Sequence, residues 1–448
     1  MNKNIIFFII DSLRTDKVVS NFSNLNNFSK LKHEGTFFSQ EISTADATLM
    51  SWSSLFTGLY PFRTGIRSAR FNKLDSNVPT LFTILKEKNY DFFGFLPSLS
   101  ETIGLFPDFK NYDSIFDINE NLSSGLGKKI LKILENKSKT SPWLLVVHIM
   151  DLHYPIHVPK EFDDDKFGKN EYEKTLSSID FWLGKFFKQI DLENTICIIT
   201  ADHGCYIKPM ISEKSNDFIL SHQSSISKIS NKIPKFLLPI KNRAFFYIEK
   251  SRKKKNEELI SKLNLLPHEN RALLSGRSDV DHFLFDESIR IPLFILGKDI
   301  PKDKLISNQI CSIDILPTIL DLLNLEKICN IDGESLVPLF DSNTILNEKF
   351  YFIESTPLVI LDSNDVIGIR TNKHKYFRDK NNSKKRVHLF DLENDPFENY
   401  NIAEENDFLV SDFELKISKI YDKNQVKINN DQLSSQEIED ELRKLGYI

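Results

Sequence analysis

A segment rich in hydroxyl side chains, residues 44–58, is the first part of the chain that could carry chemistry. Small polar residues and the glycine Gly58 predict a short helix that starts near Ser51, with Thr48 just before it. A helix N-terminus offers free backbone N–H groups, which favour anions such as phosphate or sulfate. A threonine there can act as a nucleophile when a base or a metal ion activates its hydroxyl. The alternative interpretation is that Thr48 only caps the helix.

Three continuous apolar runs predict buried parallel strands, and polar side chains follow each of them. Asp11 follows the first run, and His153 follows the second after a short turn. Asp202 and His203 follow the third run. In a parallel sheet these ends lie on one edge, which is where open α/β sheets bind ligands. The three runs are Asn4–Ile10, Trp143–Ile149 and Thr195–Thr200.

The side chains at these positions form a ligand set for a divalent cation, which consists of Asp11, Thr48, Asp202 and His203. Carboxylates suit Mg²⁺, Ca²⁺ and Mn²⁺, and an imidazole adds Zn²⁺. A metal near Thr48 would stabilise its alkoxide and polarise a phosphoryl or sulfuryl oxygen. His153 and His282 are then candidates for binding the anionic group or for protonating the leaving oxygen. Taken alone, each of these side chains also fits a purely structural role.

The elements that must position these residues alternate between strands and helices. Further strands are predicted at Phe92–Phe95 and Ile291–Leu296, and helices at Asn24–Gly35, Tyr172–Leu192 and Asp314–Leu323. Such alternation is typical of βαβ units, so the predicted fold class is α/β with a mostly parallel central sheet.

Two changes in composition divide the chain. Residues 206–277 are rich in Lys, Ser and Asn, which predicts an insertion that is a lid, a partner surface or a solvated segment. After residue 340 the predicted strands become shorter. We therefore expect a catalytic domain over residues 1–340 and a small α+β C-terminal subdomain over residues 341–448, with a charged terminal helix at Gln432–Leu445.

The composition of the whole chain argues against several classes of protein. The 448 residues carry a net charge of −5, which gives no reason to expect a nucleic-acid partner. The four cysteines include no close CxxC pair, which argues against a disulfide framework and a structural zinc knuckle. The N-terminal apolar run is short and ends in Asp11, so we interpret it as a strand rather than a signal peptide. No stretch approaches the roughly 18 apolar residues of a membrane span, and we expect a cytoplasmic protein.

The motifs occur in an order that resembles the sulfatase family of the alkaline phosphatase superfamily. Asn4–Asp16 resembles the first strand and metal aspartate of the family. Ser51–Pro61 resembles its nucleophile signature, which puts Thr48 at the nucleophile position. Segments along nearly the whole chain resemble the later motifs of the family: Asp151–Pro155, Thr200–Gly204, His282–Pro292, Asp314–Thr318, Asp332–Leu336 and Phe390–Glu398.

This resemblance implies an alkaline-phosphatase-like three-layer sandwich and a metal-dependent hydrolase of sulfate or phosphate esters. Within that family pattern, Asp11, Asp202 and His203 would hold the metal together with Thr48. The resemblance further implies an anionic ester substrate, either a small molecule or one linked to a glycan or lipid. The residues expected to bind it are Arg14, His153 and His282.

The nucleophile motif departs from the family pattern. Sulfatases carry Cys or Ser there, converted to formylglycine and followed by Pro and Arg, whereas this chain has Thr48, Met50 and Trp52. Oxidation of a threonine would give a ketone and not an aldehyde, so we expect no formylglycine and favour cleavage of phosphodiesters. Two alternatives stay open: transfer of the phospho group to another alcohol at the same site, and a non-catalytic binding protein that keeps the fold.

Overall fold

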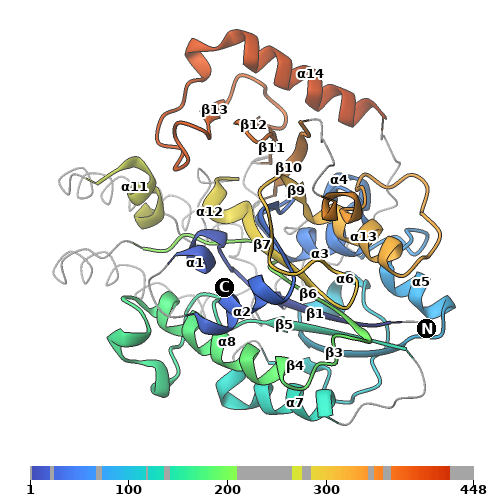
Figure 1. Ribbon diagram of the computed structural model, residues 1–448. Helices are drawn as coiled ribbons and strands as arrows, with labels where there is room; N and C mark the ends of the chain where they lie inside the picture. The colour runs from blue at the N-terminus through green and yellow to red at the C-terminus, as the bar shows by residue number, and fades with distance from the viewer. Residues whose placement is uncertain are drawn as a thin grey trace, which may run out of the picture.

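The computed structural model describes residues 3–20, 25–66, 73–117, 120–135, 142–208, 265–274, 284–341, 348–356 and 365–423. These residues form a large central sheet with helices on both faces and a second, smaller sheet (Figure 1). His282, the predicted terminal helix at Gln432–Leu445 and most of the predicted insertion lie outside these ranges. In the part of the chain that is described, no helix is both long enough and apolar enough to cross a membrane.

The central sheet places the predicted buried strands side by side. Its strands are β1 (Asn4–Ile10), β2 (Thr36–Ile42), β3 (Asp91–Pro97), β4 (Ile115–Phe116), β5 (Trp143–Ile149), β6 (Thr195–Thr200), β7 (Arg290–Leu296), β8 (Lys304–Ile306) and β9 (Ile310–Cys311). Their order is β4-β3-β5-β1-β6-β7-β2-β8, and β9 pairs with β2. β1 runs parallel to both neighbours, so that Ile9 is opposite His148 of β5 and Thr200 of β6. Among the described strands of this sheet, β7 is antiparallel to both of its neighbours, β6 and β2, and the other pairs are parallel.

Helices cover both faces of this sheet and bury two separate apolar cores. The helices described before residue 341 are α1 (Thr15–Val19), α2 (Asn26–Glu34), α3 (Thr48–Thr57), α4 (Pro61–Thr64), α5 (Leu81–Glu87), α6 (Ser100–Ile103), η1 (Leu122–Leu126), α7 (Gly127–Glu135), η2 (Lys160–Phe162), η3 (Asp165–Phe167), α8 (Glu171–Phe187), α11 (Pro267–Leu274), α12 (Asp286–Ile289), η5 (Ser312–Asp314), α13 (Ile315–Leu322) and η6 (Val337–Phe340). Phe7 and Ile9 of β1 belong to the core beneath α3, α5 and α13. Phe8 and Ile10 belong to the opposite core, beneath α2, α7 and α8. Burial on both faces explains the uninterrupted apolar run and confirms the three-layer sandwich.

The second sheet is antiparallel and lies at one end of the central sheet (Figure 1). It consists of β10 (Tyr351–Ser355), β11 (Val366–Arg370), β12 (His374–Asp379) and β13 (His388–Asp391), followed by η7 (Ala403–Glu405) and α14 (Asp407–Lys423). Phe413 and Ile417 of α14 pack in the core on this sheet. The sheet touches the preceding part of the chain next to α3, where the Glu354 amide donates to the Thr44 carbonyl at 2.9 Å. The domain boundary after residue 340 stays a prediction.

Most predicted elements are present, with some different bounds. The strands at Trp143–Ile149 and Thr195–Thr200 have the predicted ends, whereas α8 ends at Phe187 and not at Leu192. The predicted start of α3 near Ser51 is wrong, because the Ser51 amide already bonds the Ala47 carbonyl at 3.0 Å as part of the first helical turn. The helix therefore begins at Thr48 itself. It ends at the predicted glycine, because Gly58 adopts a left-handed conformation with φ 67°.

Candidate active site

The candidate active site lies at the carboxyl ends of β1 and β6, where α3 begins. Asp11 directly follows β1, and Asp202 and His203 follow β6 after one alanine. Because β1 and β6 are parallel, their ends share one edge of the sheet. Thr48 is the first residue of α3, and the N-cap residue Ala47 has no polar side chain to bind the first-turn N–H groups. This helix N-terminus is therefore suited to an anionic ligand.

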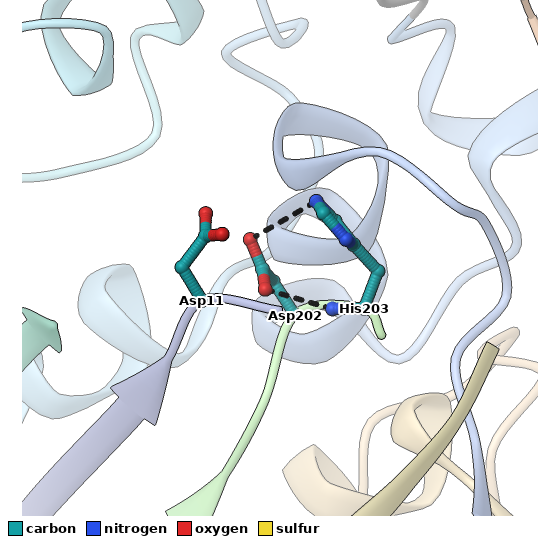
Figure 2. A group of neighbouring side chains, drawn as sticks. All are labelled: Asp11, Asp202 and His203. Carbon is teal, nitrogen blue, oxygen red and sulfur yellow. Dashed lines mark hydrogen bonds and ion pairs between the residues drawn. The ribbon is translucent and has the colours of Figure 1, made fainter. Parts of the chain in front are cut away.

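Two aspartates and a histidine converge at this edge. The ligand atoms of Asp11, Asp202 and His203 lie within 4.8 Å of one another (Figure 2). Asp11 Oδ1 accepts a hydrogen bond from the Ser12 hydroxyl at 2.6 Å. Asp202 Oδ1 accepts from the backbone amides of His203 and Ser12 at 2.7 and 3.3 Å. The Oδ2 atom of each carboxylate is buried and makes no hydrogen bond, which is costly unless a cation binds there, so the residues fit a divalent metal.

The His203 imidazole directs its Nε2 atom at the same site. Its Nδ1 atom donates to the Gly204 carbonyl at 2.8 Å, which leaves the lone pair of the neutral ring on Nε2. Nε2 lies 3.3 Å from the Thr48 hydroxyl and 3.6 Å from Asp202 Oδ2. Burial opposes the charge, but the carboxylates of Asp202 and Asp11 raise the pKa of His203 to about 9. Burial also opposes the charge of Asp202, yet His203 beside it holds the pKa of Asp202 well below its usual range. His203 must release its proton before Nε2 can act as a ligand.

Buried hydrogen bonds hold α3 against the loop that carries Asp202. The Ser43 hydroxyl donates to the Asp202 backbone carbonyl at 2.6 Å, and Ser43 Oγ lies 2.9 Å from Ser51 Oγ of α3. On the other side of this loop, a Cβ atom on Gly204 would lie 2.2 Å from the Glu287 carbonyl oxygen, so only glycine fits there. These contacts fix the start of α3 relative to the carboxylates.

Two of the predicted substrate-binding residues are described, and their roles stay predictions. The Arg14 guanidinium bonds the Asp16 carboxylate at 2.8 and 3.0 Å and the Cys205 carbonyl at 3.2 Å. His153 lies in the turn after β5, where its amide donates to the Met150 carbonyl at 2.9 Å. The cluster of metal-ligand candidates among the described residues does not include it. His282, the third, lies outside the described residues.

The sequence reasoning missed His148, a fully buried residue of β5 next to the same carboxylates. Its Nε2 atom lies 3.4 Å from Asp202 Oδ2 and 3.9 Å from Asp11 Oδ2. Its ring packs edge-to-face against Trp52 of α3, with the ring centroids 4.8 Å apart. One feature of the sequence could have pointed to it: His148 is the single polar residue inside the apolar run Trp143–Ile149.

Two family models match the chain. A model described as "Sulfatase" matches residues 3–325, which is more than half of the chain and includes the candidate active site. A model described as "N-sulphoglucosamine sulphohydrolase, C-terminal" matches residues 279–425. The chain therefore belongs to the sulfatase family, and the family predicted from the motifs is confirmed.

Curated relatives support the same family. Human arylsulfatase K is 30% identical over 126 residues, which cover 27% of this chain and 23% of that protein. Rat arylsulfatase K is 28% identical over 128 residues, with the same coverage. The chain thus spans about a quarter of the length of these relatives (23%). A longer alignment with arylsulfatase K of Xenopus laevis is 22% identical over 438 residues and covers 88% of this chain and 77% of that protein.

Solved structures share the fold at low sequence identity. The phosphonate monoester hydrolase of Agrobacterium radiobacter has a TM-score of 0.65 and 14% identity, and the match covers 94% of this chain and 96% of that chain. A putative sulfatase from Bacteroides thetaiotaomicron has a TM-score of 0.65 and 17% identity, with 95% and 93% covered. A third structure, in complex with its substrate D-glucosamine-2-N,6-O-disulfate, has a TM-score of 0.64 and 14% identity, with 95% and 99% covered. These likenesses confirm the predicted fold class.

Proposed function

We propose that this protein is a metal-dependent hydrolase of anionic esters in which Thr48 is the nucleophile and phosphodiesters are the favoured substrates. The observation that carries the proposal is the position of the Thr48 hydroxyl. It lies at the N-terminus of α3, 3.3 Å from His203 Nε2, and the ligand atoms of His203, Asp11 and Asp202 lie within 4.8 Å of one another. A helix N-terminus favours the anionic ester, and the ligand set favours ionisation of the hydroxyl.

In the proposed reaction, Thr48 Oγ1 attacks phosphorus in line with the leaving alcohol. Oγ1 releases its proton as the bond from Oγ1 to phosphorus forms, the bond from phosphorus to the leaving oxygen breaks, and the leaving oxygen takes up a proton. Water then attacks the phosphothreonine intermediate, the bond from phosphorus to Oγ1 breaks, Oγ1 regains a proton, and the phosphate monoester leaves. Asp11, Asp202 and His203 would hold the metal, which when bound supplies charge stabilisation for the alkoxide and for the phosphoryl oxygens. His153 and His282 are proposed to bind the substrate oxygens or to protonate the leaving group.

The chemistry of threonine favours phosphorus over sulfur in this proposal. Members of the family named sulfatases have a Cys- or Ser-derived aldehyde at this position, and oxidation of Thr48 would give a ketone instead. The fold itself is compatible with phosphorus substrates, since one structural neighbour is named a phosphonate monoester hydrolase. We extend the proposal to a small-molecule or glycan- or lipid-linked ester and to a cytoplasmic location.

The test is an assay of aryl phosphodiester, phosphomonoester and sulfate ester substrates with Mg²⁺, Ca²⁺, Mn²⁺ and Zn²⁺. We expect Thr48→Ala to reduce phosphodiester turnover on the order of 10³-fold or more, because the nucleophile is lost. Thr48→Ser keeps a hydroxyl and should keep measurable turnover, while Asp202→Asn should lower both turnover and metal content. Mass spectrometry of acid-quenched protein should find the retained phosphoryl group on Thr48.

A matched control comes from the same helix. Ser53 is a buried hydroxyl residue of α3 whose Oγ donates to the Met50 carbonyl at 2.7 Å, so Ser53→Ala should keep turnover. Sulfate-ester turnover that survives Thr48→Ala would contradict the threonine mechanism. Absence of turnover on every ester, in protein that binds metal, would favour the non-catalytic alternative.

A further inference from the structure

Three buried atoms that make no hydrogen bond meet beside the candidate active site. They are Nε2 of His148 and the Oδ2 atoms of Asp11 and Asp202. The side chains of all three residues are fully buried. Polar atoms that make no hydrogen bond in a protein interior are costly, and two carboxylate oxygens beside one imidazole nitrogen indicate a shared partner.

We propose that His148 Nε2 is a further ligand of the divalent metal at Asp11, Asp202 and His203, which makes the site selective for a cation such as Zn²⁺ or Mn²⁺ over Ca²⁺. The inference rests on the metal of the proposed function but not on the role of Thr48. It adds a second imidazole to the ligand set and narrows the choice of metal that the sequence left open.

The spacing of His148 Nε2 from each of the two carboxylate oxygens suits ligands of one ion. Two atoms bound to the same ion at about 2.1 Å each lie about 3.0 to 4.2 Å apart, depending on the angle at the metal. His148 Nε2 is 3.4 Å from Asp202 Oδ2 and 3.9 Å from Asp11 Oδ2, which is inside that range. A hydrogen bond is the competing explanation, but 3.9 Å is too long for one and the contact at 3.4 Å lacks a suitable geometry.

Rigid elements hold His148 in this position. β5 runs parallel to β1, and His148 is opposite Ile9, two residues before Asp11. Residues two apart on a strand point to the same face, so His148 and the Asp11 carboxylate approach from neighbouring strands on one side of the sheet. The edge-to-face packing on Trp52 then limits rotation of the imidazole ring.

The composition of this ligand set determines which metals it prefers. Ca²⁺ and Mg²⁺ prefer oxygen ligands, and Ca²⁺ takes about six to eight of them. Two imidazoles with two carboxylates instead suit Zn²⁺ and Mn²⁺. We therefore expect Zn²⁺ and Mn²⁺ to compete effectively with Ca²⁺ for the site.

Pulsed EPR of the Mn²⁺-loaded full-length protein with ¹⁵N-labelled histidine tests this assignment. The wild-type protein should show nitrogen modulation from two imidazoles, and both His148→Gln and His203→Gln should show modulation from one. His148→Gln should also weaken Mn²⁺ and Zn²⁺ binding by at least about 10-fold. The ratio of Zn²⁺ affinity to Ca²⁺ affinity should therefore fall. The control His33→Gln changes a largely exposed histidine of α2 and should keep both imidazole signals.

The outcomes separate this inference from the proposed function. A wild-type signal from one imidazole, lost in His203→Gln and retained in His148→Gln, would overturn the role of His148 and leave the proposed metal site standing. That result would favour a charged His148 that balances the two carboxylates. A wild-type protein that binds no Mn²⁺ or Zn²⁺ would overturn both. If His148→Gln fails to fold, the number of imidazoles in the wild-type signal decides the question by itself.

Discussion

Burial controls the protonation of individual carboxyl groups near the site, and Asp151 gives a measurable case. Asp151 lies shortly after β5, and both of its carboxylate oxygens face one donor, the Leu122 amide at the start of η1, at 3.2 and 3.3 Å. Burial raises the pKa of Asp151 to about 7, although the backbone amides of Leu122 and Asp151 act in the opposite direction. The charged form is therefore unfavourable in the folded protein.

The raised pKa of Asp151 should make the protein less stable as the pH rises. Between the unfolded pKa of about 3.9 and the folded value, the folded state binds more protons, so stability should fall by about 1.4 kcal/mol per pH unit. Asp151→Asn keeps an oxygen acceptor for the Leu122 amide and does not titrate. We expect a flatter pH profile and a more stable protein above about pH 7, measured by urea unfolding of the metal-free protein. The exposed Asp165 provides the control, since Asp165→Asn should keep the wild-type slope; an unchanged slope in Asp151→Asn would contradict the assignment.

At the scale of elements, the contact between α3 and the Asp202 loop determines how well the site is assembled. Ser43→Ala removes the hydrogen bond to the Asp202 carbonyl and leaves that buried oxygen without this donor. We expect a loss of about 1–3 kcal/mol in unfolding free energy and weaker Mn²⁺ binding, because the loop is no longer held against α3. Urea unfolding and equilibrium dialysis measure the two effects.

Ser53→Ala is again the control, because it should lower the free energy of unfolding without affecting the assembly of the metal site. The Ser53 hydroxyl donates to the Met50 carbonyl inside α3 at 2.7 Å, and its Oγ lies 3.1 Å from Thr64 Oγ1 of α4, so neither contact involves the Asp202 loop. Ser53→Ala should therefore lose comparable stability and keep its Mn²⁺ affinity. Equal metal affinity in Ser43→Ala and Ser53→Ala would show that the Ser43 contact has no positioning role.

β1, β3, β5, β6 and β7 were predictable from the sequence because apolar runs with polar ends have few other interpretations, whereas the short strands β4, β8 and β9 were not predicted. Their order in the sheet brings Asp11, Asp202 and His203 together with Thr48, as the parallel arrangement predicts, while the chemical roles of these residues stay predictions. The direction of β7 was not predictable, because an apolar run is the same in parallel and antiparallel strands. His148 was missed for a related reason. The apolar run of β5 does not reveal which of its side chains lies beside the end of β1, where Asp11 follows.

At the scale of the whole molecule, a buried cluster of charges joins the small antiparallel sheet to the part of the chain that holds the candidate active site. Lys375 of β12 is fully buried and pairs with Asp286 at 2.7 Å and with Glu398 at 2.6 Å. Asp286 begins α12, which leads directly into β7, and the Ser288 carbonyl of α12 accepts from the Gly204 amide at 2.8 Å. The cluster therefore reaches the loop that carries the candidate metal ligands. Sequence patterns did not predict it, because its members are far apart in the chain and nothing in their spacing shows that they meet.

Loss of the buried ammonium group should destabilise the whole molecule, and more strongly at high pH. Lys375→Met leaves Glu398 without its cation, which should cost about 3–5 kcal/mol of unfolding free energy. Burial already raises the pKa of Glu398 to about 7 although Lys375 lowers it. In the variant the carboxyl should therefore be neutral at about pH 5, and the loss of unfolding free energy should be smaller there than at about pH 8.

Lys373 is the matched control, because its ammonium lies 3.5 Å from Glu393 with both side chains more than half exposed. Lys373→Met should change the free energy of unfolding by less than about 0.5 kcal/mol. Urea unfolding at both pH values gives the comparison, and equal losses at the two pH values would show that Glu398 does not carry the effect.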